Sequence, residues 1–175
     1  MQKRVITLVL PVVLIALIAS CDDDSSTEPT SITYRATLTP AAEVNANGSS
    51  ANVQSTATGT WEGVLNRSTN TMTYTLSYQG LGSNSRFGHI HAPAATTTTA
   101  GVVIDFTSAT FGTMVVGATS GTATGTVNFA NNVTIQGNSV PGDSLRKLMD
   151  LGLTYVNVHS QTYGGGEIRG QVIKQ

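Results

Sequence analysis

The feature that most constrains this chain is a period-two alternation of apolar and polar side chains, which recurs in short segments from residue 32 onward. Clusters of Gly, Asn and Ser separate the segments, and the cluster at residues 66–70 predicts a hairpin loop. The pattern predicts an all-β fold, either an antiparallel immunoglobulin-like sandwich or a Greek-key barrel. The predicted strands are residues 32–38, 52–65, 72–78, 87–91, 102–106, 113–118, 122–129, 154–159 and 167–173.

One segment has helical periodicity instead. Leu145, Leu148 and Met149 follow the i, i+3, i+4 spacing of a buried helix face. The residues 141–144 suit a helix start, and Gly152 suits a helix end. We expect one short helix near residues 143–151, covering one end of the sheet core.

The first twenty residues have the pattern of a secretory signal peptide. A basic segment at residues 1–4 precedes an uncharged, mostly apolar run at residues 5–19. That run is shorter than the roughly 20 apolar residues that span a bilayer. We therefore expect residues 1–20 to be a signal that is removed on export.

Cys21 follows directly, in the motif Ile18-Ala19-Ser20-Cys21. The motif resembles the bacterial lipobox, in which the cysteine is acylated and the chain is cut just before it. The resemblance implies a lipoprotein that binds a membrane through lipid, such as palmitate, on Cys21. The alternative is an ordinary signal peptide followed by a chance cysteine. Residues 21–31 are acidic and small, which predicts a flexible tether. We expect the cell envelope as location, at the outer membrane or cell surface rather than the inner membrane.

The remaining residues, 32–175, are expected to form a single β domain. They carry 7 basic and 6 acidic residues, a balance that offers no basic patch for nucleic acid. Cys21 is the only cysteine, so the domain has no disulfide.

The chain contains three histidines, and the alternation places all of them on polar faces. His89 and His91 flank Ile90, so their side chains point the same way, about 6.6–6.8 Å apart along a strand. His159 ends the predicted strand 154–159. If the two strands are neighbours, the three imidazoles form one cluster.

The last two predicted strands would pair as a hairpin whose loop is centred on Tyr163. This closure sets three pairs of residues opposite each other on the outer face: His159 with Glu167, Asn157 with Arg169, and Tyr155 with Gln171. A carboxylate opposite a histidine would hydrogen-bond the ring, fix its tautomer and favour its charged form. Glu167, Asn157 and Arg169 are therefore expected to support the histidines.

Two interpretations of this polar face stay open. Three neutral imidazoles can hold Zn²⁺ or Cu²⁺, with water or Glu167 completing the coordination. The same residues can instead form a hydrogen-bonded ladder that stabilises the sheet, since no obvious fourth ligand is visible.

Six short motifs lie at residues 36–38, 42–44, 58–60, 88–94, 155–160 and 166–172. In order and spacing they resemble the CHRD domain, which was named for chordin and occurs in many microbial secreted proteins. The resemblance extends over residues 32–174 and implies an all-β fold, without an established activity for microbial members. Asn45 stands where the family commonly has proline, which is expected to loosen that turn.

We therefore expect a lipid-anchored, non-enzymatic module for binding or envelope structure, whose ligand would be an extracellular protein or polysaccharide. No complete catalytic constellation, such as Ser-His-Asp with a nucleophile elbow, is visible. The alternative is a single-metal protein or metalloenzyme that uses His89, His91 and His159. The His-Ile-His strand resembles copper–zinc superoxide dismutase, but three histidines are too few for the metal sites of that enzyme.

Overall fold

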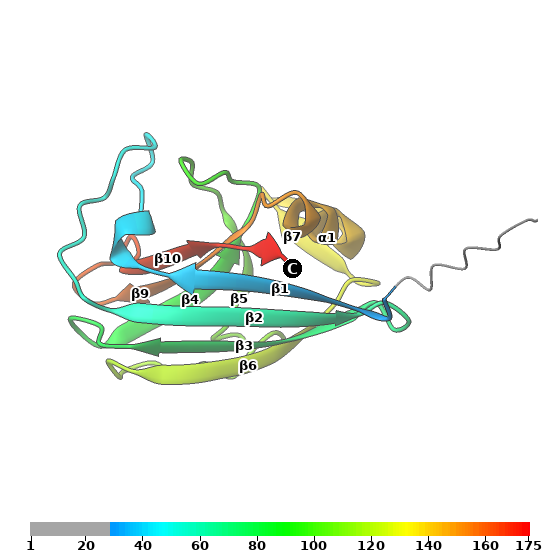
Figure 1. Ribbon diagram of the computed structural model, residues 1–175, viewed down its shortest axis with the longest axis horizontal. Helices are drawn as coiled ribbons and strands as arrows, with labels where there is room; N and C mark the ends of the chain where they lie inside the picture. Colours follow the sequence, from blue (N-terminus) through cyan, green and yellow to red (C-terminus); the bar gives the residue numbers. More distant parts are fainter. Residues whose placement is uncertain (1–28) are drawn as a thin grey trace, which may run out of the picture.

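The computed structural model describes residues 29–175 and arranges them as two facing antiparallel sheets (Figure 1). The two sheets do not join into a closed ring, so the predicted sandwich is confirmed and the barrel alternative is wrong. In the first sheet the order is β11 (Ile173–Lys174), β1 (Ser31–Leu38), β2 (Thr58–Asn66), β3 (Thr71–Gln79) and β6 (Gly121–Asn128). In the second it is β10 (Ile168–Gln171), β9 (Tyr155–Ser160), β4 (Ser85–His91) and β5 (Val102–Asp105).

The core lies between the sheets and follows from the alternation. In β2 every second side chain, from Gly59 to Leu65, is buried, and the residues between them face solvent. Trp61 of β2 stacks on Tyr74 of β3 with 6.0 Å between ring centroids, and Tyr74 lies 4.9 Å from the ring of Phe106. Burial of large apolar side chains stabilises the sandwich by about 1.5–3 kcal/mol for each one.

The centre of the second sheet, at β9 and β10, is buried on both faces, which differs from the expected exposed polar face. All six residues of β9 are buried, including Asn157 and His159. The 3₁₀ helix η1 (Pro40–Ala42) packs beside β10, and Arg169 of β10 donates to two carbonyls of the loop at residues 92–101. The expectation is wrong because these connections fold over the polar side chains.

The predicted helix is confirmed as α1 (Gly142–Asp150), one residue from the expected bounds. Its buried side includes Leu145 and Met149. Gly152 ends the helix in the left-handed region, with φ +67°. Its N–H donates to the Met149 carbonyl, and the next N–H, of Leu153, donates to Leu148. This hydrogen-bond pair is the Schellman motif, which glycine favours.

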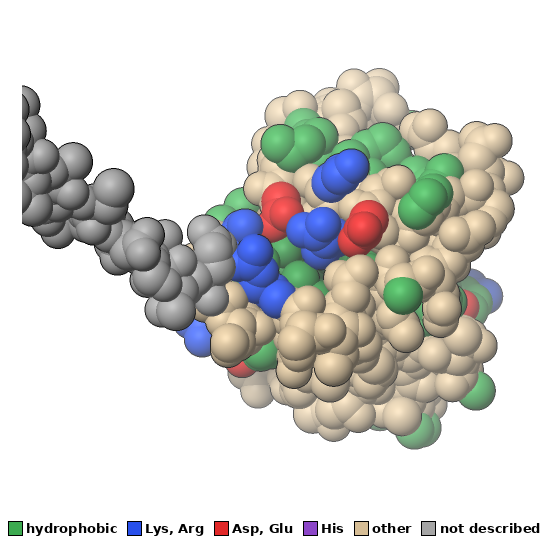
Figure 2. All heavy atoms as spheres, turned by 90° about the vertical axis from the view of Figure 1, so that its right-hand side faces the viewer, with side chains coloured by type: hydrophobic (Ala, Val, Ile, Leu, Met, Phe, Trp, Pro, Cys, Tyr) green, Lys and Arg blue, Asp and Glu red, His purple; other side chains and the backbone are tan. Residues whose placement is uncertain are grey.

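Charged side chains of both signs gather at the end of the molecule where α1 lies (Figure 2). Asp150, at the end of α1, accepts from Tyr34 of β1 at 2.8 Å and lies 3.1 Å from Lys174 of β11. Arg146 lies 3.5 Å from the same carboxylate. These contacts attach the helix to the first sheet.

The segment 113–118, predicted as a strand, is irregular. The Met114 N–H donates to Phe106, whereas the Gly117 N–H donates to Ser85. Because its donors go to two different segments, it cannot continue a single ladder.

Two further differences concern turns. Residues 52–57 precede β2 outside any strand, and Asn52 has φ +52°. The sequence did not predict the hairpin of β7 (Asn132–Ile135) and β8 (Asn138–Pro141). Its two turn residues, Gln136 and Gly137, have φ of +51° and +79°, as a type I′ turn requires.

The predicted signal peptide at residues 1–20, the lipidation of Cys21 and most of the tether at residues 21–31 lie outside the described residues. Among residues 29–175, no helix is both long enough and apolar enough to cross a lipid bilayer.

Candidate metal site

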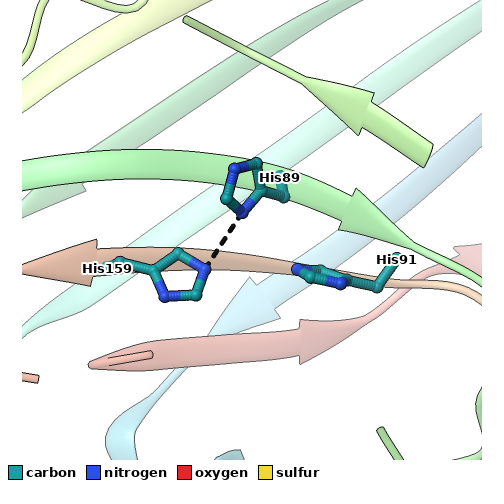
Figure 3. A group of neighbouring side chains, drawn as sticks. All are labelled: His89, His91 and His159. Carbon is teal, nitrogen blue, oxygen red and sulfur yellow. Dashed lines mark hydrogen bonds between the residues drawn. The ribbon is translucent and has the colours of Figure 1, made fainter. Parts of the chain in front are cut away.

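Pairing of β4 with β9 brings the three histidines together. In the register of this pair, His89 lies opposite Asn157, and Phe87 lies opposite His159. One ring nitrogen from each of His89, His91 and His159 lies within 4.8 Å of the other two, and the rings point toward a common centre (Figure 3). The sequence predicted this cluster on the condition that the strands were neighbours, and the condition is met.

The inner nitrogens make short contacts with one another and with an amide. His89 Nδ1 lies 3.0 Å from His159 Nε2. His91 Nε2 lies 3.1 Å from Oδ1 of Asn157. Four donor atoms that a metal could use therefore face one small region of the second sheet.

The outer nitrogens of two histidines are held by backbone carbonyls. His91 Nδ1 lies 2.9 Å from the Ala100 oxygen, and His159 Nδ1 lies 3.0 Å from the Gly164 oxygen. A carbonyl only accepts, so in a neutral ring each of these contacts assigns the proton to Nδ1. The Nε2 lone pairs then point inward, where a metal could take them.

Asp105 on β5 provides the corresponding outer contact for His89. Its Oδ1 lies 3.9 Å from His89 Nε2, and the two residues are paired in the β4–β5 register. The same oxygen accepts from the Thr107 backbone N–H at 2.8 Å and from its hydroxyl at 2.6 Å. Asp105 is thus fixed near the outer nitrogen of His89, at a distance too long for a hydrogen bond.

Burial keeps the imidazoles neutral. It lowers the pKa of His89 to about 4, helped by the neighbouring rings of His159 and His91. Burial likewise lowers the pKa of His91 to about 4, against the hydrogen bond to the Ala100 carbonyl, and lowers that of His159. At neutral pH all three rings are available as uncharged ligands.

Tyr155 stacks on His91, and Arg169 in turn contacts Tyr155. The Tyr155 ring stacks on the His91 ring with 4.6 Å between centroids and an angle of 7°. The guanidinium of Arg169 lies 3.6 Å from the Tyr155 centroid on a cation–π contact. Arg169 also donates to the loop 92–101, whose Ala100 carbonyl orients His91. One buried side chain thereby holds both the stack and the loop.

The predicted hairpin register is confirmed, since Arg169 pairs with Asn157 and Gln171 pairs with Tyr155. The expected carboxylate–histidine contact of Glu167 is wrong. One oxygen of Glu167 accepts from the Ser55 hydroxyl at 2.6 Å and from the Gly82 N–H at 2.7 Å, while His159 is oriented by Gly164. The segment before β2 folds over the sheet, and its Ser55 hydroxyl hydrogen-bonds with the Glu167 carboxylate.

Two supporting residues were missed by the sequence reasoning. Glu43 is buried beside the Asn157 side-chain amide, and Asp105 faces His89. Asp105 lies within the predicted strand 102–106, so pairing that strand with residues 87–91 would have found it. No local pattern links Glu43 to Asn157, because 113 intervening residues separate them.

Comparison with known protein families gives a match to the CHRD domain over residues 34–172. The chain belongs to the CHRD-domain family. Neither a curated protein nor a solved structure matches it. At the position where the family commonly has proline, Asn45 closes the turn of this CHRD domain instead of loosening it. Its N–H donates to the Ser49 carbonyl at 2.7 Å, and its side-chain amide donates to the Ser50 carbonyl at 3.1 Å.

Proposed function

We propose that this CHRD protein is a non-enzymatic metal-binding module of the cell envelope, which holds one Zn²⁺ or Cu²⁺ through His89, His91 and His159. One observation carries the proposal: three buried imidazoles each point one ring nitrogen at a common centre, while their outer nitrogens face two carbonyls and a carboxylate. Metal-binding histidines characteristically have such outer partners.

The distances agree with this chemistry. A Zn–N bond is about 2.0–2.1 Å, so two nitrogens on one tetrahedral zinc lie about 3.3 Å apart. The His89 and His159 nitrogens are 3.0 Å apart, whereas the three nitrogens together span up to 4.8 Å, so binding also requires the His91 ring to move inward. Imidazole nitrogen suits both zinc and copper.

The location is proposed from the sequence alone. Residues 1–20 have the pattern of an export signal, and Cys21 stands in a lipobox-like motif. Lipid on Cys21 would hold the protein on a membrane, with the β domain displayed outside the cytoplasm. Cells fed radiolabelled palmitate should label the wild-type protein and leave Cys21→Ala unlabelled; equal labelling of both excludes the anchor.

A second candidate, an envelope-structural domain, rests on the direct contact between His89 and His159. That contact completes a hydrogen-bonded network without any metal. Metal analysis of the full chain, purified in detergent and dialysed against Zn²⁺ or Cu²⁺, separates the two candidates. The metal-binding module predicts nearly one metal per chain, lost in His91→Ala and His159→Ala. The structural module predicts no metal above the background of the variants.

Glu62→Gln is the matched control for adventitious binding. Glu62 is an exposed carboxylate in a surface ion pair with Arg35, on the first sheet. Its replacement should leave the metal content unchanged, and a drop equal to that of the histidine variants would contradict a specific site.

A further inference from the structure

We propose that the Asn157 side-chain oxygen is the fourth ligand of this metal and that Glu43 is the residue that turns it toward the histidines. The inference deepens the proposed metal site and rests on it. Asn157 is 2% exposed and lies on β9, directly opposite His89 in the β4–β9 register. Its Oδ1 is 3.1 Å from His91 Nε2, close to the separation of two ligands on one zinc.

The orientation of the amide follows from Glu43. The Asn157 NH₂ group and the Glu43 carboxyl group lie on the same side, both next to the position that a Cβ of residue 166 would occupy. The carbonyl oxygen on the other branch of the amide must then face His91. Glu43 thereby acts as a positioning residue, one step away from the metal.

Gly166 permits this contact. A Cβ at residue 166 would collide with the Glu43 carboxylate and with Asn157 Nδ2, and the residue has φ +132°. Glycine is therefore required on two grounds, and its absence of a side chain leaves the space in which Glu43 reaches Asn157.

The surroundings of His91 favour a cation between its ring and the Asn157 amide. Nδ1 faces the Ala100 carbonyl and Nε2 faces the Asn157 carbonyl, so both nitrogens meet acceptors. A neutral imidazole has a single N–H and satisfies only one of them. A metal ion between Nε2 and Oδ1 converts two opposed lone pairs into two ligands.

Acids and a buried cation both lie near the proposed ligands, with Arg169 on the side of His91. The four proposed ligands are neutral, while Glu43 and Asp105 each place a carboxylate against one of them. Four protein ligands close the coordination of a tetrahedral zinc, as in structural rather than catalytic sites. The inference therefore specifies a closed site that holds the metal without activating water.

The test uses the full chain in detergent, stripped with chelator and titrated with Zn²⁺ and Co²⁺. Tetrahedral Co²⁺ absorbs much more strongly in the visible range than Co²⁺ with added water ligands. Asn157→Leu should weaken Zn²⁺ binding about 10- to 100-fold and lose the intense Co²⁺ band. Glu43→Gln should weaken binding in the same direction, because glutamine no longer forces the amide orientation.

Thr154→Val is the control, since Thr154 is fully buried at the edge of β9 and its hydroxyl lacks a hydrogen-bond partner. Its affinity and Co²⁺ spectrum should match wild type. Asn157→Asp keeps an oxygen ligand and should keep the intense band, which provides a test if Asn157→Leu fails to fold.

Three outcomes separate the two proposals. A wild-type chain that binds no metal overturns the proposed function and this inference together. A wild-type chain that binds metal, with Glu43→Gln and Asn157→Leu equal to Thr154→Val, overturns the fourth ligand and leaves the three-histidine site intact. If Asn157→Leu does not fold, a Glu43→Gln chain with wild-type affinity and spectrum overturns the inference.

Discussion

Nδ1 of His89 lies 3.0 Å from Nε2 of His159, although 70 positions separate the two residues in the chain. The contact exists because β4 and β9 are adjacent antiparallel strands with their polar sides covered. In the metal-free protein the pair forms a hydrogen bond, for which His89 Nδ1 carries the proton, because the proton of His159 lies on its own Nδ1 beside the Gly164 carbonyl. In the account given above, the same two nitrogens separate slightly and become ligands.

The metal-free domain should lose stability as the pH falls from about 6.5 toward 4. In the unfolded chain, histidine takes up a proton near pH 6.5, whereas burial lowers the pKa of both His89 and His91 to about 4. The unfolded state therefore binds more protons in this window, and one such shift corresponds to about 3 kcal/mol. Urea titrations at a series of pH values measure the slope. The His89→Gln/His91→Gln double variant should have a shallower slope, and an unchanged slope would contradict burial of neutral rings.

Glu43 should act in the opposite direction. Burial raises its pKa from 4.5 to about 7, against the favourable charge of Arg169. The folded state then holds the proton more tightly, so this residue's contribution to stability falls as the pH rises from 4.5 through 7. Relative to wild type, Glu43→Gln should become progressively more stable over that range. For Glu62→Gln, at an exposed position, the difference in stability from wild type should not change with pH. The same pH-independent difference for Glu43→Gln would contradict the raised pKa of Glu43.

Arg169→Ala should cost about 2–4 kcal/mol of unfolding free energy. The side chain is 1% exposed, stacks on Tyr155 and donates two hydrogen bonds to the loop 92–101. Arg35→Ala is the matched control, because Arg35 forms an exposed ion pair with Glu62 and should cost less than about 1 kcal/mol. Chemical denaturation measures the free energy of unfolding of both variants. Equal losses would show that the hydrogen bonds of Arg169 do not stabilise the loop 92–101.

The alternation of the sequence was sufficient to predict an all-β fold, with sandwich and barrel both open, and the hairpin register around Tyr163. The helix was predicted from the i, i+3, i+4 spacing of Leu145, Leu148 and Met149. The alternation was insufficient for the second sheet, because period two reports which residues share a face and says nothing about what covers that face. The polar side of β9 is covered by η1, by the segment before β2 and by the loop 92–101, which are distant in sequence. The supporting carboxylates were missed for that reason. Asp105 and Glu43 meet the site only through the tertiary fold.

Gly166→Ala should destabilise the protein by about 1–3 kcal/mol and weaken metal binding at the same time. A methyl group there meets the Glu43 carboxylate, and the positive φ adds strain. Gly165→Ala changes the neighbouring position, where an added Cβ has no atom within 4 Å, and should leave the affinity for metal unchanged. Thermal melts and Zn²⁺ titrations of both variants provide the comparison. Similar results for both would mean that the contact between Glu43 and Asn157 does not matter for the site.

X-ray absorption at the metal edge of the purified protein, loaded with one equivalent of Zn²⁺ or Cu²⁺, tests the central claim most directly. The outer-shell scattering of imidazole rings reports how many histidines bind the ion. The account predicts three imidazoles on one metal, and a loss of that signal in the His91→Ala and His159→Ala variants. A spectrum with only oxygen ligands, or one unchanged by these substitutions, would contradict the convergence of His89, His91 and His159 on a metal ion.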